Sequence, residues 1–387
     1  MKRSVKAKRT ARRRLAASAR RGAPRFREDL LEALSNADGV SGGEDVVRAL
    51  VADAVRDRVD SMEVDALGSL VARIGVDDAR QSRGNGGNGG ANGRPRPGAP
   101  HVMLCAHLDE VGIMITAIEK EGRLRFRRAG GLDPRLMAGQ VFRIGSRGVR
   151  GVVGILPPHL TSHADEEKVI PFEDLYLDIG ASSRDEAAEH VSLGDYGVFD
   201  TTYERWGSIR KGKAFDDRVG CAVLASLVQE RPPVPVTAVW SVQEEVGLRG
   251  ATAAARRVMP DVALVLEGTA SGEAPGASVE ESAPLMGGGP TLTVHDRTLM
   301  ADVRLVELLR RTAASRRIAT QWKRPGVGGT DAGRISLSGS GVPSAVISVA
   351  CRYIHAPAAY LDVRDPERTV SLVWHALSAL GKEWSSR

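Results

Sequence analysis

Residues 101–109 read HVMLCAHLD, and the first six of them, His101–Ala106, form a short apolar run typical of a buried strand. Three similar runs follow later in the chain, at Val236–Val242, Val262–Leu266 and Ala345–Val349. Helical patterns separate the runs, notably at Val219–Val228 and Leu299–Ile318. Because strands alternate with helices, the sequence predicts an α/β fold, a layered α/β/α domain.

Each apolar run is followed closely by residue types that bind metal ions. In chain order these residues are His107, the pair Glu244 and Glu245, Glu267, and His355. In open α/β sheets, ligands bind beyond the carboxyl ends of the strands. Four separate strands that deliver His or Glu to one edge therefore predict a metal site there. The chain has only 8 histidines, which gives more weight to two of them at strand ends.

Two short motifs add further candidates, and each also has an ordinary structural interpretation. Asp109 lies two residues after His107, on the same side of an extended segment, where it could accept the second N–H of a metal-binding histidine. A purely structural histidine would account for the same pattern. Asp216, in the Asp-Asp-Arg sequence before Val219–Val228, could bridge two cations, or it could simply cap that helix.

The adjacent acids Glu244 and Glu245 are the most informative pair. Two glutamates that end an apolar strand are costly to bury if both ionise without compensation. One of them could be a metal ligand while the other is a general base toward metal-activated water. The alternative is a pair of solvated surface acids. Elsewhere in the chain, Gly328–Asp331 reads as a tight turn, which would have a functional role only if it approaches the site.

Two histidines and three carboxylates supply terminal ligands for each of two cations, with Asp216 between them. A nitrogen and oxygen donor set without sulfur suits Zn²⁺, Co²⁺ or Mn²⁺. Paired cations about 3.5–4 Å apart suit the hydrolysis of an amide bond. We therefore expect two divalent metal ions per subunit.

The pattern of predicted secondary structure differs between regions of the chain. Residues 117–203 contain short β-like pieces separated by Gly and Asp, which predicts a small all-β domain inserted into the α/β domain of residues 28–116 and 204–387. One short helix is expected within the insertion at Ser182–Glu189. Ser41–Glu44 resembles a capping box, and Asp365 is the expected N-cap of the last helix.

Two segments are predicted to be flexible. Residues 1–27 hold twelve Lys or Arg and no acid, which leaves the remainder of the chain at −6 against +6 for the whole. Such a tail is expected to be disordered. Contact of the tail with nucleic acid is a weaker alternative, as is a transit peptide. Residues 81–100 are rich in Gly and Asn and predict a flexible surface loop.

Cysteine usage and hydropathy indicate the compartment. The three cysteines, Cys105, Cys221 and Cys351, lie in apolar stretches without metal-binding or disulfide spacing, which fits the reducing cytoplasm. No apolar run approaches the ~18–20 residues that a membrane-spanning helix needs, so no membrane segment is expected.

Together these motifs resemble the TET-type and glutamyl (deblocking) aminopeptidases, the dinuclear metallopeptidases of family forty-two, some of which have been labelled endoglucanases. The resemblance runs from about residue 30 to the C-terminus in the family's order. The matching segments are VDALG (64–68), AHLDEVGIM (106–114), GGLDPRLMAGQ (130–140), EDLYLDIGA (173–181), KAFDDRVG (213–220), QEEVGLRGA (243–251), LEGT (266–269), GGTDAG (328–333) and RYIHAP (352–357).

The resemblance implies a role for each candidate residue. His107 and Glu267 would bind one metal, Glu245 and His355 the other, and Asp216 would bridge them. Glu244 would be the general base and Asp109 the partner of His107. It also implies an α/β metallopeptidase domain with an inserted β-barrel used for oligomer contacts, commonly in dodecamers, and an aminopeptidase activity on short peptides.

Two other functions stay open on the sequence alone. One is a different hydrolase on the same site: a dinuclear deacylase, an amidase or a glycosidase. A glycosidase would use two carboxylates without a metal. The other is a non-enzymatic protein that binds nucleic acid through residues 1–27.

Overall fold

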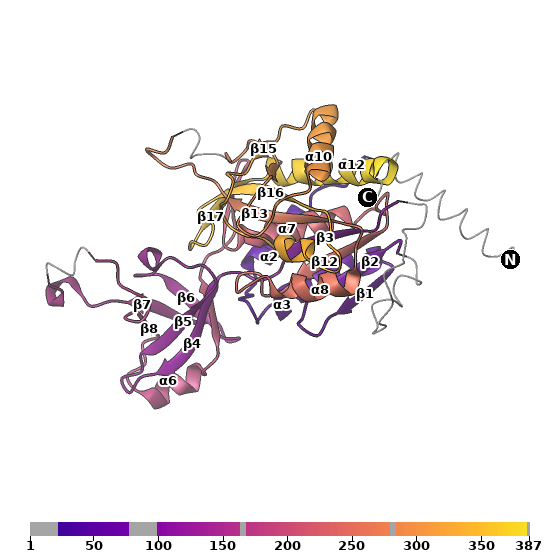
Figure 1. The fold of residues 1–387 in the computed structure, drawn as a ribbon. Helices are drawn as coiled ribbons and strands as arrows, with labels where there is room; N and C mark the ends of the chain where they lie inside the picture. The colour runs from indigo at the N-terminus through magenta and orange to yellow at the C-terminus, as the bar shows by residue number, and fades with distance from the viewer. Residues whose placement is uncertain (1–21, 77–98, 163–167, 279–283, 385–387) are drawn as a thin grey trace.

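The computed structural model describes residues 22–76, 99–162, 168–278 and 284–384 (Figure 1). Its larger part is built on a mixed sheet with the strand order β1-β2-β12-β3-β13-β16-β17-β11-β10. Two further strands, β14 and β15, join it at β16. The bounds are β1 Ser61–Val64, β2 Leu70–Ile74, β3 Val102–His107, β10 Glu204–Trp206, β11 Ile209–Gly212, β12 Val236–Ser241, β13 Val262–Ala270, β14 Thr291–Thr293, β15 Gln321–Trp322, β16 Ser344–Arg352 and β17 Ala359–Asp362.

The four apolar runs predicted as strands lie together in the middle of this sheet, as β12, β3, β13 and β16. Strand β3 is parallel to both β12 and β13, and β13 is parallel to β16. Parallel strands present their carboxyl ends at the same edge of a sheet. The residues that end or follow these four strands are therefore brought to one place.

Helices cover both faces of the sheet, which confirms the layered α/β/α prediction. One face packs against α2, α3, α7, α10 and α12, and the other against α8 and α11. The helix bounds are α2 Glu28–Asn36, α3 Asp45–Val55, α7 Phe215–Leu227, α8 Arg249–Val258, α10 Val303–Arg316, α11 Asp331–Ser336 and α12 Arg364–Glu383, with short 3-10 helices at Arg56–Arg58, Pro134–Leu136 and Pro158–Leu160.

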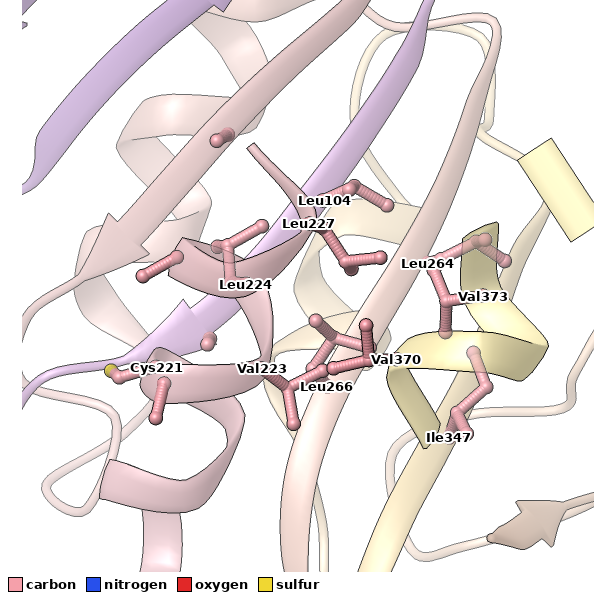
Figure 2. Packing of buried hydrophobic residues seen from close by; sticks show 14 of the residues in the cluster. Leu104, Cys221, Val223, Leu224, Leu227, Leu264, Leu266, Ile347, Val370 and Val373 are labelled. Atoms are coloured by element: carbon pink, nitrogen blue, oxygen red, sulfur yellow. The ribbon is translucent and has the colours of Figure 1, made fainter. Parts of the chain in front are cut away.

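Strand β3 illustrates how the two faces divide its side chains. Leu104 and Ala106 belong to the core under α7 and α12, whereas Met103 and Cys105 belong to the core under α8 and α11. This division follows from the alternation of side chains along a strand. Figure 2 shows the first core, where residues of α7 and α12 meet Leu264 and Leu266 of β13. Since both faces of β3 are covered, its sequence is continuously apolar.

The inserted part is a closed barrel with the strand order β4-β5-β8-β7-β6-β9. It has its own core and projects to one side of the α/β domain, at the lower left of Figure 1. Its first strand begins at Gly112, earlier than the expected start at residue 117. Its elements are β4 Gly112–Ile118, β5 Leu124–Ala129, β6 Val141–Ile144, β7 Val149–Gly154, β8 Tyr176–Asp178, α6 Arg184–His190 and β9 Tyr196–Phe199.

The helix predicted within the insertion is present as α6, and Ser183 caps it by accepting a hydrogen bond from the amide of Glu186. The other two cap predictions are wrong. The side chain of Asp365 lies inside α12 and accepts hydrogen bonds from the amides of Gly287 and Gly289 instead. No side chain caps α3, because Ser41 donates its hydroxyl to Asp109. In both cases a distant partner replaces the local cap.

The predicted flexible segments fall mostly outside the described residues, namely residues 1–21 of the tail and 81–98 of the loop. The prediction of disorder is wrong for the end of the tail, residues 22–27, which is ordered. The amide of Arg27 donates to Ser226 Oγ at 2.9 Å, and Phe26 packs against the main core. The end of the loop also folds, since Ala99 packs against the same core. Among the described residues, no helix combines the length and apolar character needed to cross a membrane.

Three buried charged residues join the two segments of the α/β domain that flank the inserted barrel. Glu110 accepts hydrogen bonds from Lys213 Nζ at 2.6 and 2.9 Å and from Arg218 Nη2 at 3.0 Å. All three are almost fully buried. Arg218 also donates to the main-chain oxygens of Leu108 and Gly39. This cluster therefore fixes the segment after β3 against the start of α7.

We predict that Glu110→Gln lowers the free energy of unfolding by about 3–5 kcal/mol, because it removes the buried counter-charge that Lys213 and Arg218 share. Urea unfolding measures this change. The matched control is Asp53→Asn, which removes an exposed ion pair with Arg56 and should change stability little. Equal effects of the two substitutions would contradict a structural role for the buried cluster.

Candidate metal centre

The structure brings together the seven residues predicted for the site. His107 is the last residue of β3, Glu267 lies in the second half of β13, and Glu244 and Glu245 follow β12. His355 lies three residues after β16. Their ligand-type atoms form overlapping groups within 4.8 Å of one another: His107, Asp216 and Glu267; Asp216, Glu245 and His355; and His107, Glu244 and Glu245.

Asp216 stands between the two histidines. Its Oδ1 lies 3.2 Å from His107 Nε2, and its Oδ2 lies 3.4 Å from His355 Nε2. Each histidine also faces a second carboxylate. His107 Nε2 is 3.6 Å from Glu267 Oε2, and His355 Nε2 is 3.0 Å from Glu245 Oε1. The arrangement is thus two histidine–carboxylate pairs that share one carboxylate.

The start of α7 explains how Asp216 reaches this position. Asp216 and Asp217 have non-helical backbone angles. Asp217 does the work of a cap, because its carboxylate accepts hydrogen bonds from the amides of Gly220 and His107. The capping role therefore belongs to Asp217, and Asp216 faces the cluster.

A glycine in β13 allows the close approach of Asp216. A Cβ atom at Gly268 would lie 2.9 Å from Asp216 Cα and 3.1 Å from the main-chain oxygen of Phe215. Both contacts are with backbone, which cannot move aside as a flexible side chain would. Gly268 therefore lets the start of α7 lie directly against β13.

Asp109 fixes the backbone of two residues of the cluster by hydrogen bonds. Its carboxylate accepts hydrogen bonds from the amides of Glu244 and Glu245, at 3.0 and 3.1 Å, and from Ser41 Oγ at 2.7 Å. His107 Nδ1 lies 3.1 Å from the main-chain oxygen of Asp109 and 3.4 Å from its carboxylate. One fully buried side chain thus fixes the backbone of both glutamates and adjoins the histidine ring.

The electrostatics of the cluster reflect crowded negative charge. Burial raises the pKa of Glu244 and of Glu267 well above the usual carboxyl range. Burial alone would lower the pKa of His355, but its hydrogen bonds to Asp216 and Glu245 outweigh this and raise it to about 11. Four carboxylates and two histidines gathered in one partly enclosed site therefore favour the presence of further positive charge.

The donor atoms fit divalent cations. Glu267 Oε1 is buried and has no hydrogen-bond partner within the described part of the chain, and the buried Glu245 Oε1 faces His355 Nε2 at 3.0 Å. A buried carboxylate oxygen without a donor is costly unless a cation or another group satisfies it. Imidazole nitrogen and carboxylate oxygen are suitable ligands for Zn²⁺, Co²⁺ and Mn²⁺. These residues could hold metal ions at the predicted position.

A cavity of about 450 Å³ opens onto this cluster. Beyond the cluster it is lined by Leu248, Thr298 and the turn Gly328–Thr330, so the turn predicted from the sequence does approach the site. Two basic side chains, Lys323 and Arg334, also line it. The sequence analysis missed both, since neither lies at a strand end or in a ligand-type motif.

Asp331 is a third residue to which the sequence analysis gave no role of its own. It is buried at the start of α11, and its Oδ2 accepts a hydrogen bond from Ser241 Oγ at 2.5 Å. Because Ser241 ends β12, this bond ties the turn Gly328–Thr330 to the strand that leads to the two glutamates. The only available signal was its place at the end of the turn predicted for Gly328–Asp331.

Comparisons with known proteins find related aminopeptidases. A lysyl aminopeptidase of Pyrococcus furiosus is 30% identical over 361 residues, 91% of this chain and 97% of that protein. The structure of a TET aminopeptidase from a marine-sediment Thaumarchaeota archaeon has a TM-score of 0.81 and 33% identity, and the match covers 91% of this chain and 98% of that one.

A third relative is the TET1 peptidase of Pyrococcus horikoshii, described as able to assemble into a tetrahedron or a large octahedral shell. Its structure has a TM-score of 0.76 and 30% identity, and the match covers 92% of this chain and 99% of that one. The family described as M42 glutamyl aminopeptidase matches residues 87–372, which include every residue of the candidate metal centre. The chain belongs to the M42 glutamyl aminopeptidase family of peptidases.

Proposed function

We propose that this aminopeptidase removes N-terminal residues from short peptides with the help of two divalent metal ions. The observation that supports this most directly is the position of Asp216, whose two oxygens face two different histidines. A site for a single cation would need only one of these two oxygens and one of the two histidines. A carboxylate shared by two histidine–carboxylate pairs matches the ligand set of a two-metal site.

The ligands divide into two sets on the basis of their separations. His107 and Glu267 would hold one cation, and His355 and Glu245 the other, with Asp216 common to both. Zn²⁺ or Co²⁺ best fits such donors, and Mn²⁺ is a third candidate. When bound, the cations supply a Lewis acid for the scissile carbonyl and lower the pKa of the attacking water.

Glu244 is our candidate for the general base. It lines the cavity beside the metal ligands and is not needed in either ligand set. Its carboxylate would take a proton from the attacking water and deliver it to the nitrogen of the leaving amine. The backbone hydrogen bond from Glu244 to Asp109 holds the glutamate where this transfer can occur.

We assign Asp109 a positioning role. Its carboxylate accepts hydrogen bonds from the backbone amides of Glu244, the proposed base, and Glu245, a proposed metal ligand. It also adjoins His107 Nδ1, where it would favour the ring orientation that directs Nε2 toward Asp216. Loss of Asp109 would therefore disturb base and ligands together.

A metal-independent glycosidase is the rival that shares these residues. It would use two carboxylates on either side of a sugar bond. The two histidines facing Asp216 have no role in that chemistry, whereas they supply one nitrogen to each ligand set here. A dinuclear deacylase or another amidase would share the ligands and differ only in substrate.

We further propose that the chain is a homo-oligomer. Large apolar side chains are exposed on strand β7 of the barrel and on the segment that follows it, with Val152 at 45%, Leu156 at 56% and Leu160 at 63% of their surface accessible. Exposed apolar groups that gather in one region are typical of contact surfaces. Light scattering should give a multiple of the 41.2 kDa subunit mass, and a monomer at all concentrations would refute this proposal.

The cytoplasm is the compartment that the cysteines support. All three are free thiols buried in the α/β domain. Buried unpaired thiols are common where the surroundings are reducing. Recovery of the active protein only from a secreted fraction after cell fractionation would contradict this assignment.

We predict that chelation abolishes hydrolysis of aminoacyl nitroanilides and that Zn²⁺, Co²⁺ or Mn²⁺ restores it. Glu244→Gln should retain the bound metal but lower kcat by about 10²–10⁴-fold, because the variant cannot accept the proton of the water. Metal content is measured by elemental analysis and kcat by the release of nitroaniline.

The matched control for this experiment is Glu121→Gln, which changes an exposed acid in the turn between β4 and β5. It should leave both metal content and kcat unchanged. Hydrolysis that survives complete removal of the metal would rule out the two-metal proposal. A Glu244→Gln variant with nearly normal kcat would rule out only the assignment of the base.

The proposed role of Asp109 predicts a second result. Asp109→Asn leaves at least one buried amide or hydroxyl donor without an acceptor, at a cost of about 1–3 kcal/mol in unfolding free energy. It should also lower kcat/KM. Asp65 is a matched control, because its carboxylate likewise accepts several backbone amides, those of Leu67, Gly68 and Ser69.

Asp65→Asn should therefore reduce stability while leaving kcat/KM unchanged. Urea unfolding and nitroanilide hydrolysis are measured side by side for the two variants. If Asp109→Asn lost stability without any loss of kcat/KM, Asp109 would be only a structural residue.

A further inference from the structure

The inserted barrel reaches the metal centre through the loop of residues 130–133, which follows β5 and is called the barrel loop here. A Cβ atom on Gly131 would lie 3.0 Å from His355 Nδ1. A Cβ atom on Gly130 would lie 3.2 Å from Glu245 Cβ. His355 and Glu245 are the two residues proposed to hold one of the cations together with the shared aspartate, and we call them the second set. Both members of the second set therefore lie against the barrel.

The residues proposed for the other cation, His107 and Glu267, are the first set, and they are held by the α/β domain. His107 ends β3, Glu267 lies in β13, and these two strands pair with each other. Nδ1 of His107 faces the main-chain oxygen of Asp109, two residues along the chain, at 3.1 Å. The central sheet and the chain directly after β3 thus position the first set.

The ring of His355 has the same kind of partner, but this partner comes from the barrel. His355 Nδ1 lies 3.3 Å from the main-chain oxygen of Gly131, which is 224 positions away in the sequence. A carbonyl oxygen can only accept a hydrogen bond, so this contact places the proton on Nδ1. The lone pair of Nε2 is then directed toward Asp216 and Glu245, where a cation would bind.

The backbone of His355 also needs support from outside its own segment. Its φ of +58° lies in the left-handed region, which is unfavourable for a residue other than glycine and persists only where the surroundings fix it. Thr201, two residues after the barrel strand β9, donates its hydroxyl to the main-chain oxygen of Pro357 at 2.6 Å. The segment that carries His355 is therefore in contact both with the barrel loop and with the chain that leaves the barrel.

The barrel loop is itself fixed to the barrel. Ala129, at the end of β5, pairs with Gly112 at the start of β4. The side chain of Leu132 is buried in the barrel core, and its main-chain oxygen accepts a hydrogen bond from Arg128 Nη1 at 3.1 Å. The loop is thus held at both ends of its two glycines, and it can serve as a firm support for the residues that it touches.

We propose that the barrel loop is a positioning element for the second set, and that it controls the affinity of the cation bound there without affecting the first set. This inference rests on the two-metal site of the proposed function. Metal affinity is sensitive to such support because ligand distances must lie within about 0.2 Å of their preferred values. A methyl group on Gly131 would displace the imidazole of His355 by a few tenths of an ångström.

The test is the binding of Zn²⁺ alone to the metal-free protein, measured by equilibrium dialysis over a range of free Zn²⁺ with elemental analysis. Gly131→Ala should raise the dissociation constant of one of the two ions by about 10–100-fold, the usual effect of disturbing the partner of a metal-binding histidine. The other constant should not change. Zinc anomalous diffraction at an intermediate concentration of free Zn²⁺ should show that the lost occupancy is that of the second set.

The matched control is Gly151→Ala in β7. Its added Cβ would also meet a neighbour at 3.0 Å, but that neighbour is Ile144 in the core of the barrel. Gly151→Ala should therefore leave both dissociation constants unchanged, which separates a general disturbance of the barrel from a displacement of His355.

Thr201→Val is a second variant, which adds no bulk next to the metal centre. It removes the hydrogen bond to Pro357 and should weaken the same ion as Gly131→Ala, to a smaller extent. Its control is Thr161→Val, which removes hydroxyl bonds to main-chain oxygens in the segment after β7 and should change neither constant. If Gly131→Ala does not fold, the comparison of these two threonine variants decides the question.

Unchanged affinities in both Gly131→Ala and Thr201→Val, or an equal loss of affinity at the two sites, would overturn the inference. These outcomes leave the two-metal proposal standing, because the unaltered protein still binds two ions. If the unaltered protein bound only one Zn²⁺ per subunit, the two-metal proposal itself would fail first.

Discussion

The carboxylate of Asp216, held between His107 and His355, is the contact on which the rest of the site depends. It exists because β3, β13 and β16 run parallel and end at the same edge, while the start of α7 crosses that edge against Gly268. Asp217 accepts the hydrogen bond from the amide of Gly220 at the start of the helix, so that Asp216 can face the cluster instead. Without this division between adjacent aspartates, two histidine–carboxylate pairs would have no shared member.

The fold stabilises a cluster that would otherwise repel itself. Four carboxylates lie close together, and burial raises the pKa of Glu244, Glu245 and Glu267. The two buried acids next to the cluster have partners of their own: Asp109 accepts three hydrogen bonds, and Glu110 pairs with Lys213 and Arg218. Cations bound by the buried carboxylate oxygens of Glu245 and Glu267 would offset this cost.

The central strands and the cluster could be predicted from the sequence because each signal was local. A continuous apolar run followed within a few residues by His or Glu describes both a buried strand and its chemistry. Signals failed where a distant partner decides: Asp365 serves two glycine amides instead of a cap, and Ser41 serves Asp109. Lys323 and Arg334 were missed for the same reason, since only the folded chain brings them to the cavity.

Diffraction from crystals grown with Zn²⁺, recorded on both sides of the zinc absorption edge, tests the two-metal site most directly. We expect two anomalous peaks, one between His107 and Glu267 and one between His355 and Glu245, with an oxygen of Asp216 directed at each. A single peak, or peaks away from these side chains at full zinc occupancy, would contradict the shared-carboxylate site.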